Sequence, residues 1–255
     1  MAVPASVSLL CLPCAGASAS MYLRWRRLLP RWTEVVPVEL PGRGARMGEP
    51  FVDNFDAQVE RICAEQAGAM QGAFVLFGHS MGALLAYGVA QRLRALGRPL
   101  PRALLASGSS APSRRDPARL PDTRDDAALT ADLRKQGGTP EEVFASAELM
   151  RITLDTLGAD YRVCESFTYT AEAPLPMPLH VFAGRQDDID AQRIEAWSAH
   201  AAGAFTLDWF DGGHFFLRQH EATFLDALTR RLAQVQAPTQ AAAVAGGRHA
   251  PHALA

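Results

Sequence analysis

Residues 74–83 read Phe-Val-Leu-Phe-Gly-His-Ser-Met-Gly-Ala. The apolar run 74–77 has the length and composition of a buried strand, and a helical pattern begins near Ala83. The Gly-His-Ser-Met-Gly string at 78–82 therefore occupies the turn from a strand to a helix. Small residues on either side of a serine let such a turn close tightly and project the hydroxyl from the edge of a sheet. The stretch predicts that Ser80 is a nucleophile.

Short apolar runs of the same kind recur on both sides of this stretch, at 6–12, 35–40, 103–106, 179–183 and 205–210. Segments with helical spacing separate the first of them, for example Phe55, Val59 and Ile62. Parallel strands need long crossover connections, and these connections must cover the sheet. The alternation therefore predicts an α/β fold with a mostly parallel central sheet flanked by helices.

The alternation stops after Ser107. From 111 to 173 the chain first offers Pro and Arg and then shows charged helical patterns at 127–136, 141–150 and 152–163, without a convincing strand. Ligands bind beyond the carboxyl ends of the strands in such sheets, so we expect a helical lid insertion over the site. We expect 1–236 to form a single domain and 237–255, rich in Ala, Gly, Pro and Gln, to be a disordered tail.

The overall composition is that of a globular protein. Hydrophobic residues make up 48% and charged residues 20%, and the formal net charge of −2 gives no polybasic field for nucleic acid. The four cysteines show no regular spacing, so we expect reduced thiols and a cytoplasmic protein. The apolar run near the N-terminus is too short for a signal or a membrane span, which predicts neither export nor a membrane partner.

A serine hydroxyl needs a base that accepts its proton and an acidic group that orients the base. Among the seven histidines, His214 is our preferred base, because Gly-Gly-His at 212–214 follows the last predicted strand. His79 is the rival candidate. Because His79 is the neighbour of Ser80 in a sharp turn, the two side chains point in different directions, so we expect His79 to pack the turn.

The acid is predicted after the run 179–183, within Gly-Arg-Gln-Asp-Asp at 184–188. We choose Asp187, and Asp188 is the alternative if the turn is shifted by one residue. Otherwise Asp188 would cap the helix that follows. Either carboxylate satisfies the chain order of serine, acid and histidine. Neither shows metal-ligand spacing with a histidine, so we expect no metal.

The tetrahedral oxyanion of acyl transfer needs two backbone donors. One should be the amide of Met81, which follows the nucleophile, and the other should lie in the loop after the first strand. We nominate Ala15 for the second donor. Cys11 and Cys14 form a CxxC string there, but no second pair accompanies it, so a zinc or redox role is disfavoured.

Several motifs together resemble the type II thioesterases that accompany nonribosomal peptide and polyketide synthases. The motifs are the loop 12–20, Pro-Gly-Arg-Gly-Ala-Arg at 41–46 with Glu49-Pro50, the 78–82 turn, Asp160-Tyr161 with Tyr169, 184–187, and Gly-Gly-His-Phe-Phe at 212–216. The 41–46 segment discriminates most, because a generic esterase does not need it. The chain departs from the family at Cys14, often histidine there, at Ala17, often glycine, and at Gly158, often arginine.

The resemblance implies an α/β-hydrolase fold and a cytoplasmic editing enzyme. Such an enzyme hydrolyses misprimed or stalled acyl groups from the phosphopantetheine arm of carrier proteins. Acyl or peptidyl carrier protein domains are then the expected partners, and no cofactor is needed because the arm is part of the substrate. Carrier proteins are commonly acidic, so Arg43 and Arg46 are candidate docking residues, with ordinary solvated arginines as the alternative.

Two other functions fit the same residues. The triad also cleaves oxygen esters, so a stand-alone carboxylesterase is one alternative. A non-catalytic scaffold that binds synthase domains is the other.

Overall fold

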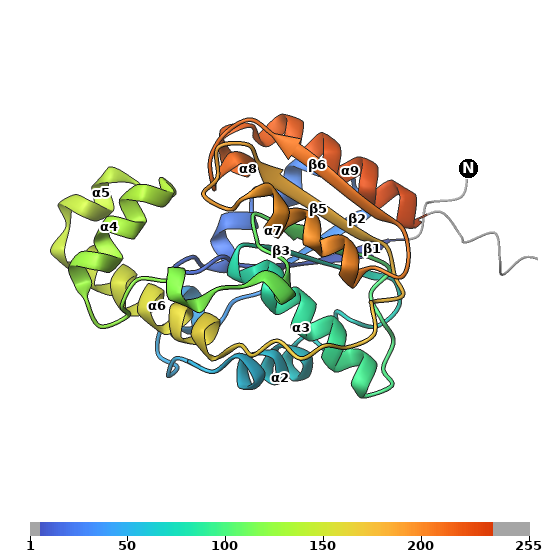
Figure 1. The fold of residues 1–255 in the computed structure, drawn as a ribbon, viewed down its shortest axis with the longest axis horizontal. Coiled ribbons are helices and arrows are strands. Elements are labelled where there is room, and N and C mark those ends of the chain that lie inside the picture. Colours follow the sequence, from blue (N-terminus) through green and yellow to red (C-terminus); the bar gives the residue numbers. More distant parts are fainter. Residues whose placement is uncertain (1–5, 237–255) are drawn as a thin grey trace, which may run out of the picture.

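The computed structural model describes residues 6–236. Within this part of the chain, six strands form one sheet in the order β2-β1-β3-β4-β5-β6 (Figure 1). The strands are β1 Val7–Leu12, β2 Thr33–Pro37, β3 Phe74–His79, β4 Leu104–Ser107, β5 Leu179–Gly184 and β6 Phe205–Phe210. Every neighbouring pair is parallel. The predicted α/β fold with a parallel sheet is therefore confirmed, whereas the tail predicted at 237–255 lies outside the described residues.

Helices cover both faces of the sheet (Figure 1). The helices of the described residues are α1 Trp25–Leu28, α2 Phe55–Glu65, α3 Met81–Ala95, α4 Asp126–Gln136, α5 Glu141–Ala145, α6 Ala147–Ser166, α7 Ala191–Glu195, α8 Phe216–Gln219 and α9 Glu221–Gln236. In β1, Leu10 and Leu12 pack with α2 and α3, while Leu9 and Cys11 pack with α1 and α9. Because successive side chains of a strand point to opposite faces, a strand covered on both faces is apolar throughout.

The order of the strands reverses at β1. The chain passes from β1 to β2 on one side and returns to β3 on the other side of β1, then continues outward through β4 and β5 to β6. The loops that leave the carboxyl ends of β1 and β3 therefore diverge at a topological switch point, where open α/β sheets bind their ligands. These two loops carry Ala15 and Ser80.

The segment between β4 and β5 forms α4, α5 and α6. In Figure 1, α4 and α5 project away from the sheet, and α6 joins them to the body of the molecule. We predicted helical patterns at 141–150 and 152–163, but the break between helices lies at Ser146. Ser146 ends α5 and starts α6, because its side chain accepts a hydrogen bond from the Leu149 amide at 3.3 Å. The function of the segment as a lid stays a prediction.

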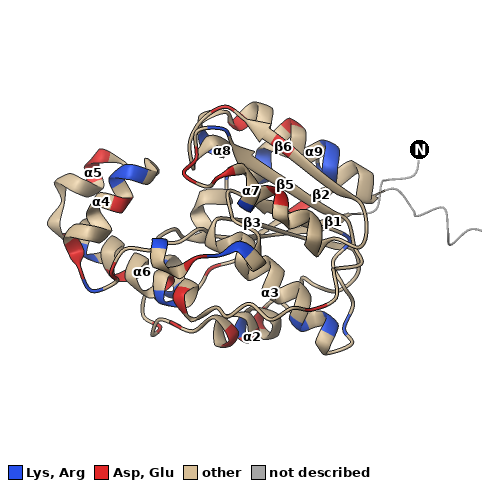
Figure 2. Cartoon of the chain, viewed as in Figure 1, with Lys and Arg blue, Asp and Glu red and all other residues tan. Residues whose placement is uncertain are grey.

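Charged residues of both signs are interspersed along the helices (Figure 2). Over residues 6–236, no helix combines the length and the apolar character needed to span a membrane.

Candidate active site

Ser80 lies in a strained turn between β3 and α3. Its φ is 56° and its ψ is −116°, and among the described residues it is the only one other than glycine with a positive φ. A side chain in this region costs on the order of 1–3 kcal/mol, and such strain is kept mainly at functional sites. The Ser80 amide donates to the Ser107 carbonyl of β4 at 2.8 Å, which fixes the turn to the sheet edge.

The two glycines of the turn are required by close backbone contacts. A Cβ on Gly78 would lie 2.0 Å from the Gly82 carbonyl, and a Cβ on Gly82 would lie 2.2 Å from the Leu12 carbonyl oxygen. Real Cβ atoms do not approach other atoms so closely, so only glycine lets the turn close. The second contact also brings the end of β1 against the first turn of α3.

His79 packs beneath the turn, as expected from its position. Its side chain is fully buried, and its Nδ1 lies 3.0 Å from the Ser107 hydroxyl. Burial lowers the pKa of His79 well below its usual value, and the adjacent His214 lowers it further. The ring centroids of the two histidines are 4.9 Å apart. His79 therefore stays neutral and adds no positive charge beside His214.

His214 and Asp187 come from the loops that follow β6 and β5. The Nδ1 atom of His214 lies 2.8 Å from Oδ2 of Asp187, and their side chains are only 11% and 5% exposed. The loops are held together by a hydrogen bond from the Gln186 amide to the Gly212 carbonyl at 3.0 Å. An imidazole held in this way keeps Nδ1 engaged and leaves Nε2 for proton transfer.

Asp188 points elsewhere. Its carboxylate pairs with Lys135 of α4 at 2.5 Å, and its side chain is 52% exposed. The capping role considered for Asp188 is wrong, because Asp190 caps α7 by accepting from the Arg193 amide at 2.9 Å.

A cavity of about 410 Å³ lies between these loops and the inserted helices. It is bordered by all the residues predicted for the chemistry, namely Ser80, Asp187, His214, Met81 and Ala15. Leu133 of α4 and Leu157 of α6 give it apolar walls. Within residues 6–236 the Ser80 hydroxyl makes no hydrogen bond to another residue. The hydrogen bond between a nucleophilic serine and its base is often long without substrate and tightens when substrate binds.

Met81 and Ala15 lie where backbone donors are needed. Met81 is the first residue of α3, so its amide has no acceptor within the helix. Ala15 lies in the loop after β1, which the Gly82 contact holds close to the same helix end. Their function as oxyanion donors stays a prediction.

Two thiols border the same cavity, and neither is a rival nucleophile. Burial raises the pKa of Cys14 to about 12 and that of Cys164 to about 11. Because the thiolate is the reactive and metal-binding form, both stay unreactive at neutral pH. All four cysteines are unpaired. In the part of the chain that the structure describes, no group of three or more His, Cys, Asp or Glu side chains could hold a metal ion.

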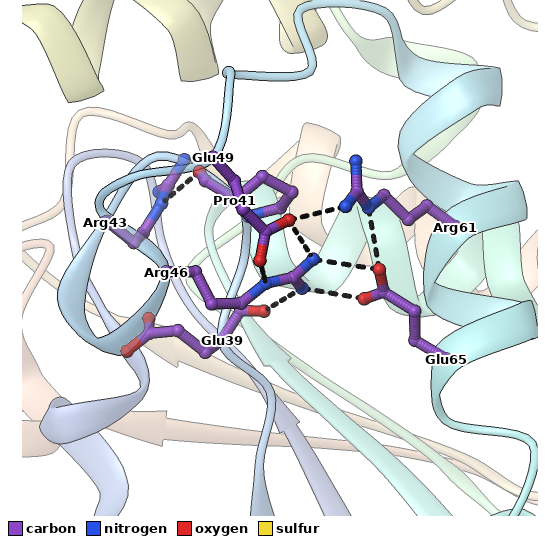
Figure 3. A network of polar contacts seen from close by, with 7 residues as sticks. All are labelled: Glu39, Pro41, Arg43, Arg46, Glu49, Arg61 and Glu65. Atoms are coloured by element: carbon purple, nitrogen blue, oxygen red, sulfur yellow. Dashed lines mark hydrogen bonds and ion pairs between the residues drawn. The ribbon is translucent and has the colours of Figure 1, made fainter.

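The docking function predicted for Arg43 is wrong. Its side chain is 6% exposed, and its two terminal nitrogens each donate to one carboxylate oxygen of Asp160 on α6 at 2.6 Å. The same guanidinium donates to the Ala17 carbonyl. It also donates to the Pro41 carbonyl (Figure 3). A buried and paired charge cannot attract a partner through solvent. Arg43 instead joins the loop after β2 to α6 within the molecule.

Arg46 also makes ion pairs within the molecule, and its docking function stays a prediction. Figure 3 shows its guanidinium between the carboxylates of Glu49 and Glu65, with hydrogen bonds of 2.6–2.9 Å. Arg61 of α2 joins the same two carboxylates. The side chain of Arg46 is only 19% exposed. The 41–46 segment is thus fastened to α2.

Asp160 has contacts that the sequence analysis did not anticipate. It was noted as part of a family motif, but it also accepts a hydrogen bond from the Gly16 amide at 2.8 Å, beside Ala15. A signal for this was present: Leu157, Asp160 and Cys164 have the spacing of one helix face, and a carboxylate within an apolar face needs a buried partner.

Comparisons with known proteins agree with this geometry. Residues 7–234 match the family model described as a thioesterase domain. The chain is 34% identical over 239 residues to the gramicidin S biosynthesis protein GrsT of Aneurinibacillus migulanus, covering 92% of each. It is similar in structure to RedJ, a thioesterase from the prodiginine biosynthetic pathway in Streptomyces coelicolor, with a TM-score of 0.81, 35% identity and 91% of each chain covered. The type II thioesterase BorB from the borrelidin biosynthetic cluster gives a TM-score of 0.82 at 36% identity, covering 92% of this chain and 95% of BorB.

Proposed function

The chain belongs to the thioesterase family, among the type II thioesterases of nonribosomal peptide and polyketide synthase systems, and we propose that it is an editing enzyme. In this proposal it hydrolyses misprimed or stalled acyl groups from the phosphopantetheine arm of carrier proteins. The observation that carries the proposal is that Ser80 occupies a strained turn at a cavity that His214 also lines. Oδ2 of Asp187 lies 2.8 Å from Nδ1 of this histidine.

The proposed acylation step uses these residues in order. His214 Nε2 accepts the proton of the Ser80 hydroxyl, and the oxygen attacks the thioester carbonyl. The amides of Met81 and Ala15 stabilise the tetrahedral oxyanion, while Asp187 stabilises the imidazolium. The imidazolium then protonates the departing pantetheine sulfur, which leaves an acyl-serine.

The second step consumes water. His214 removes a proton from the water, the resulting nucleophile attacks the acyl-serine, and the acid is released as Ser80 regains its proton. The sum of the two steps is thioester plus water to acid plus thiol. No electron is transferred, so the proposed reaction needs no cofactor, and the phosphopantetheine arrives with the substrate.

The proposed partners are acyl or peptidyl carrier protein domains. With Arg43 and Arg46 occupied internally, Arg119 is the better candidate to meet an acidic carrier at the cavity. It is exposed, borders the cavity and donates to the Asp188 carbonyl at 2.9 Å. No carboxylate in residues 6–236 forms an ion pair with it. The unpaired cysteines support our placing the enzyme in the cytoplasm.

The function is tested by comparing three substrates that carry the same acyl group: an acylated carrier protein, an acyl-pantetheine and an oxygen ester. We expect the highest kcat/KM on the carrier protein and no turnover by Ser80→Ala. Salt should weaken the reaction on the carrier protein more than the reaction on the small thioester, because charge attraction between the proteins is screened. A preference for the oxygen ester would instead support a carboxylesterase, and full activity of Ser80→Ala would refute the assignment.

A further inference from the structure

The loop that carries the second candidate oxyanion donor has little regular support of its own. We define the oxyanion loop as residues 13–18, directly after β1. It contains a turn in which the Ala17 amide donates to the Cys14 carbonyl at 3.1 Å, and Gly16 has a φ of 75°. Because Ala15 lies inside this turn, the direction of its amide depends on how the turn is held.

A buried ion pair holds this turn from outside. Oδ2 of Asp160 accepts from the Gly16 amide at 2.8 Å, and the guanidinium of Arg43 donates to the Ala17 carbonyl at 3.1 Å. The two residues that follow Ala15 are therefore each fixed by one member of the pair. The members come from distant parts of the chain, Arg43 from the loop after β2 and Asp160 from α6.

The charges of the pair also bear on catalysis. A lone carboxylate close to the oxyanion loop would oppose the negative charge that develops on the substrate. Arg43 cancels this charge by a two-pronged contact, with both N–O distances at 2.6 Å. The loop thus gains a strong acceptor for the Gly16 amide without an uncompensated charge beside the site.

Stability alone gives a weak reason for such a pair. The side chains are 6% and 1% exposed, and the cost of removing two charges from water offsets much of their attraction. Apolar residues of similar size often stabilise a protein as well as a buried ion pair does. Fixed geometry at the neighbouring loop is a function that apolar residues cannot supply.

We propose that Asp160 and Arg43 are positioning residues, which direct the Ala15 amide toward the oxyanion by holding the oxyanion loop. The inference rests on the proposed acyl transfer at Ser80. It assigns a function to two residues that touch no substrate.

The test uses Asp160→Asn and the double variant Arg43→Met with Asp160→Leu. Asparagine has one acceptor oxygen and cannot serve Arg43 and the Gly16 amide as the carboxylate does. The double variant removes both charges but fills the space with apolar groups, which protects folding. Asp208→Asn is the control, because Asp208 also makes a bidentate pair, with Arg231 at 2.9–3.0 Å, and neither residue borders the cavity.

Each variant is assayed for kcat and KM on an acyl-pantetheine, for melting temperature and for affinity to an alkyl boronic acid. The boronic acid forms a negatively charged tetrahedral adduct with Ser80, so its affinity reports the oxyanion donors. Loss of one donor costs about 10²–10³ in kcat, and we expect misdirection of one to cost at least about tenfold. Boronate affinity should fall by a similar factor, and KM should change by less than about threefold.

In the double variant we expect lower kcat and lower boronate affinity, with KM little changed and a melting temperature close to that of the parent. Asp208→Asn should be unchanged in kcat. The inference is overturned if the folded double variant keeps parental kcat and boronate affinity. It is also overturned if every variant, Asp208→Asn included, loses activity in proportion to its melting temperature. Failure of the parent protein to hydrolyse the thioester would refute the proposed function instead, and boronate binding would still report on the loop.

Discussion

Lys135 of α4 lies 2.5 Å from Asp188, the residue next to the carboxylate that holds His214. Two further contacts join the inserted segment to the same loops: Arg119 donates to the Asp188 carbonyl at 2.9 Å, and Arg218 donates to the Gly138 carbonyl at 2.9 Å. The outer helices therefore close on the candidate site through polar contacts near the surface. Contacts of this kind are weak individually, so we predict that they open for the proposed substrate arm.

Lys135→Ala should loosen this closure without unfolding the protein. The partners are 61% and 52% exposed, so the loss is worth at most about 1 kcal/mol, which corresponds to up to about a fivefold rise in the open fraction. Hydrogen exchange of the α4 amides, followed by mass spectrometry, should accelerate accordingly. Arg134→Ala is the control, because Arg134 pairs with Glu141 inside the insertion at 3.6 Å. Equal exchange in the two variants would show that the Lys135 contact does not restrain α4.

Asp187→Asn and Asp188→Asn should have different effects on kcat. An amide cannot stabilise the His214 imidazolium and favours the wrong tautomer, so we expect kcat to fall by about 10³–10⁴. Asp188→Asn should change kcat by less than about threefold, because Asp188 pairs with Lys135. The measurement is kcat on one small thioester, with circular dichroism to verify folding. Similar losses in both variants would mean that the loop rearranges and that the observed hydrogen bond is not the productive one.

Acid should destabilise the fold through His180 of β5. Burial, together with the smaller effect of the nearby Arg231, lowers its pKa from 6.5 to about 4. Below pH 6.5 His180 takes up a proton in the unfolded chain, whereas in the folded chain it stays neutral down to about pH 4. The stability that is present above pH 6.5 is therefore lost as the pH falls through this window. We expect the free energy of unfolding to fall by about 2 kcal/mol between pH 6.5 and pH 5 from this residue.

Denaturant unfolding of the parent and of His180→Asn at both pH values measures this effect. Asparagine does not titrate but can keep a hydrogen bond to Thr206, which now lies 2.8 Å from Nδ1 of His180. The variant should be less stable near neutral pH and should lose less stability on acidification. An identical loss in both proteins would assign the acid sensitivity to other groups, of which the buried His79 is the first to examine.

The sequence predicted the parts of the molecule that depend on local pattern. The 78–82 turn and the apolar runs around it were sufficient to predict the parallel sheet, because period and turn chemistry are encoded by neighbouring residues. Asp187 and His214 could be chosen as candidates from the order of the residues in the chain and from their positions after predicted strands. The choice between Asp187 and Asp188 needed coordinates, since a shift of one residue in a loop reverses the direction of a side chain.

The error at Arg43 concerns a pair that is distant in sequence. Arginine is usually a surface residue, but Arg43 is buried because it pairs with Asp160, 117 positions later in the chain. No local pattern encodes that partner. The carboxylate within the apolar face of α6 was the one visible sign that a buried cation was required.

The central claim, that an acyl group passes through Ser80, is tested most directly by rapid-quench mass spectrometry. The enzyme is mixed with an excess of acylated carrier protein, quenched with acid within the first turnover and digested with a protease. We predict that the peptide containing Ser80 gains the mass of the acyl group minus one hydrogen, in proportion to the carrier thiol released. Release of carrier thiol with an unmodified Ser80 peptide, together with undiminished release by Ser80→Ala, would contradict the account.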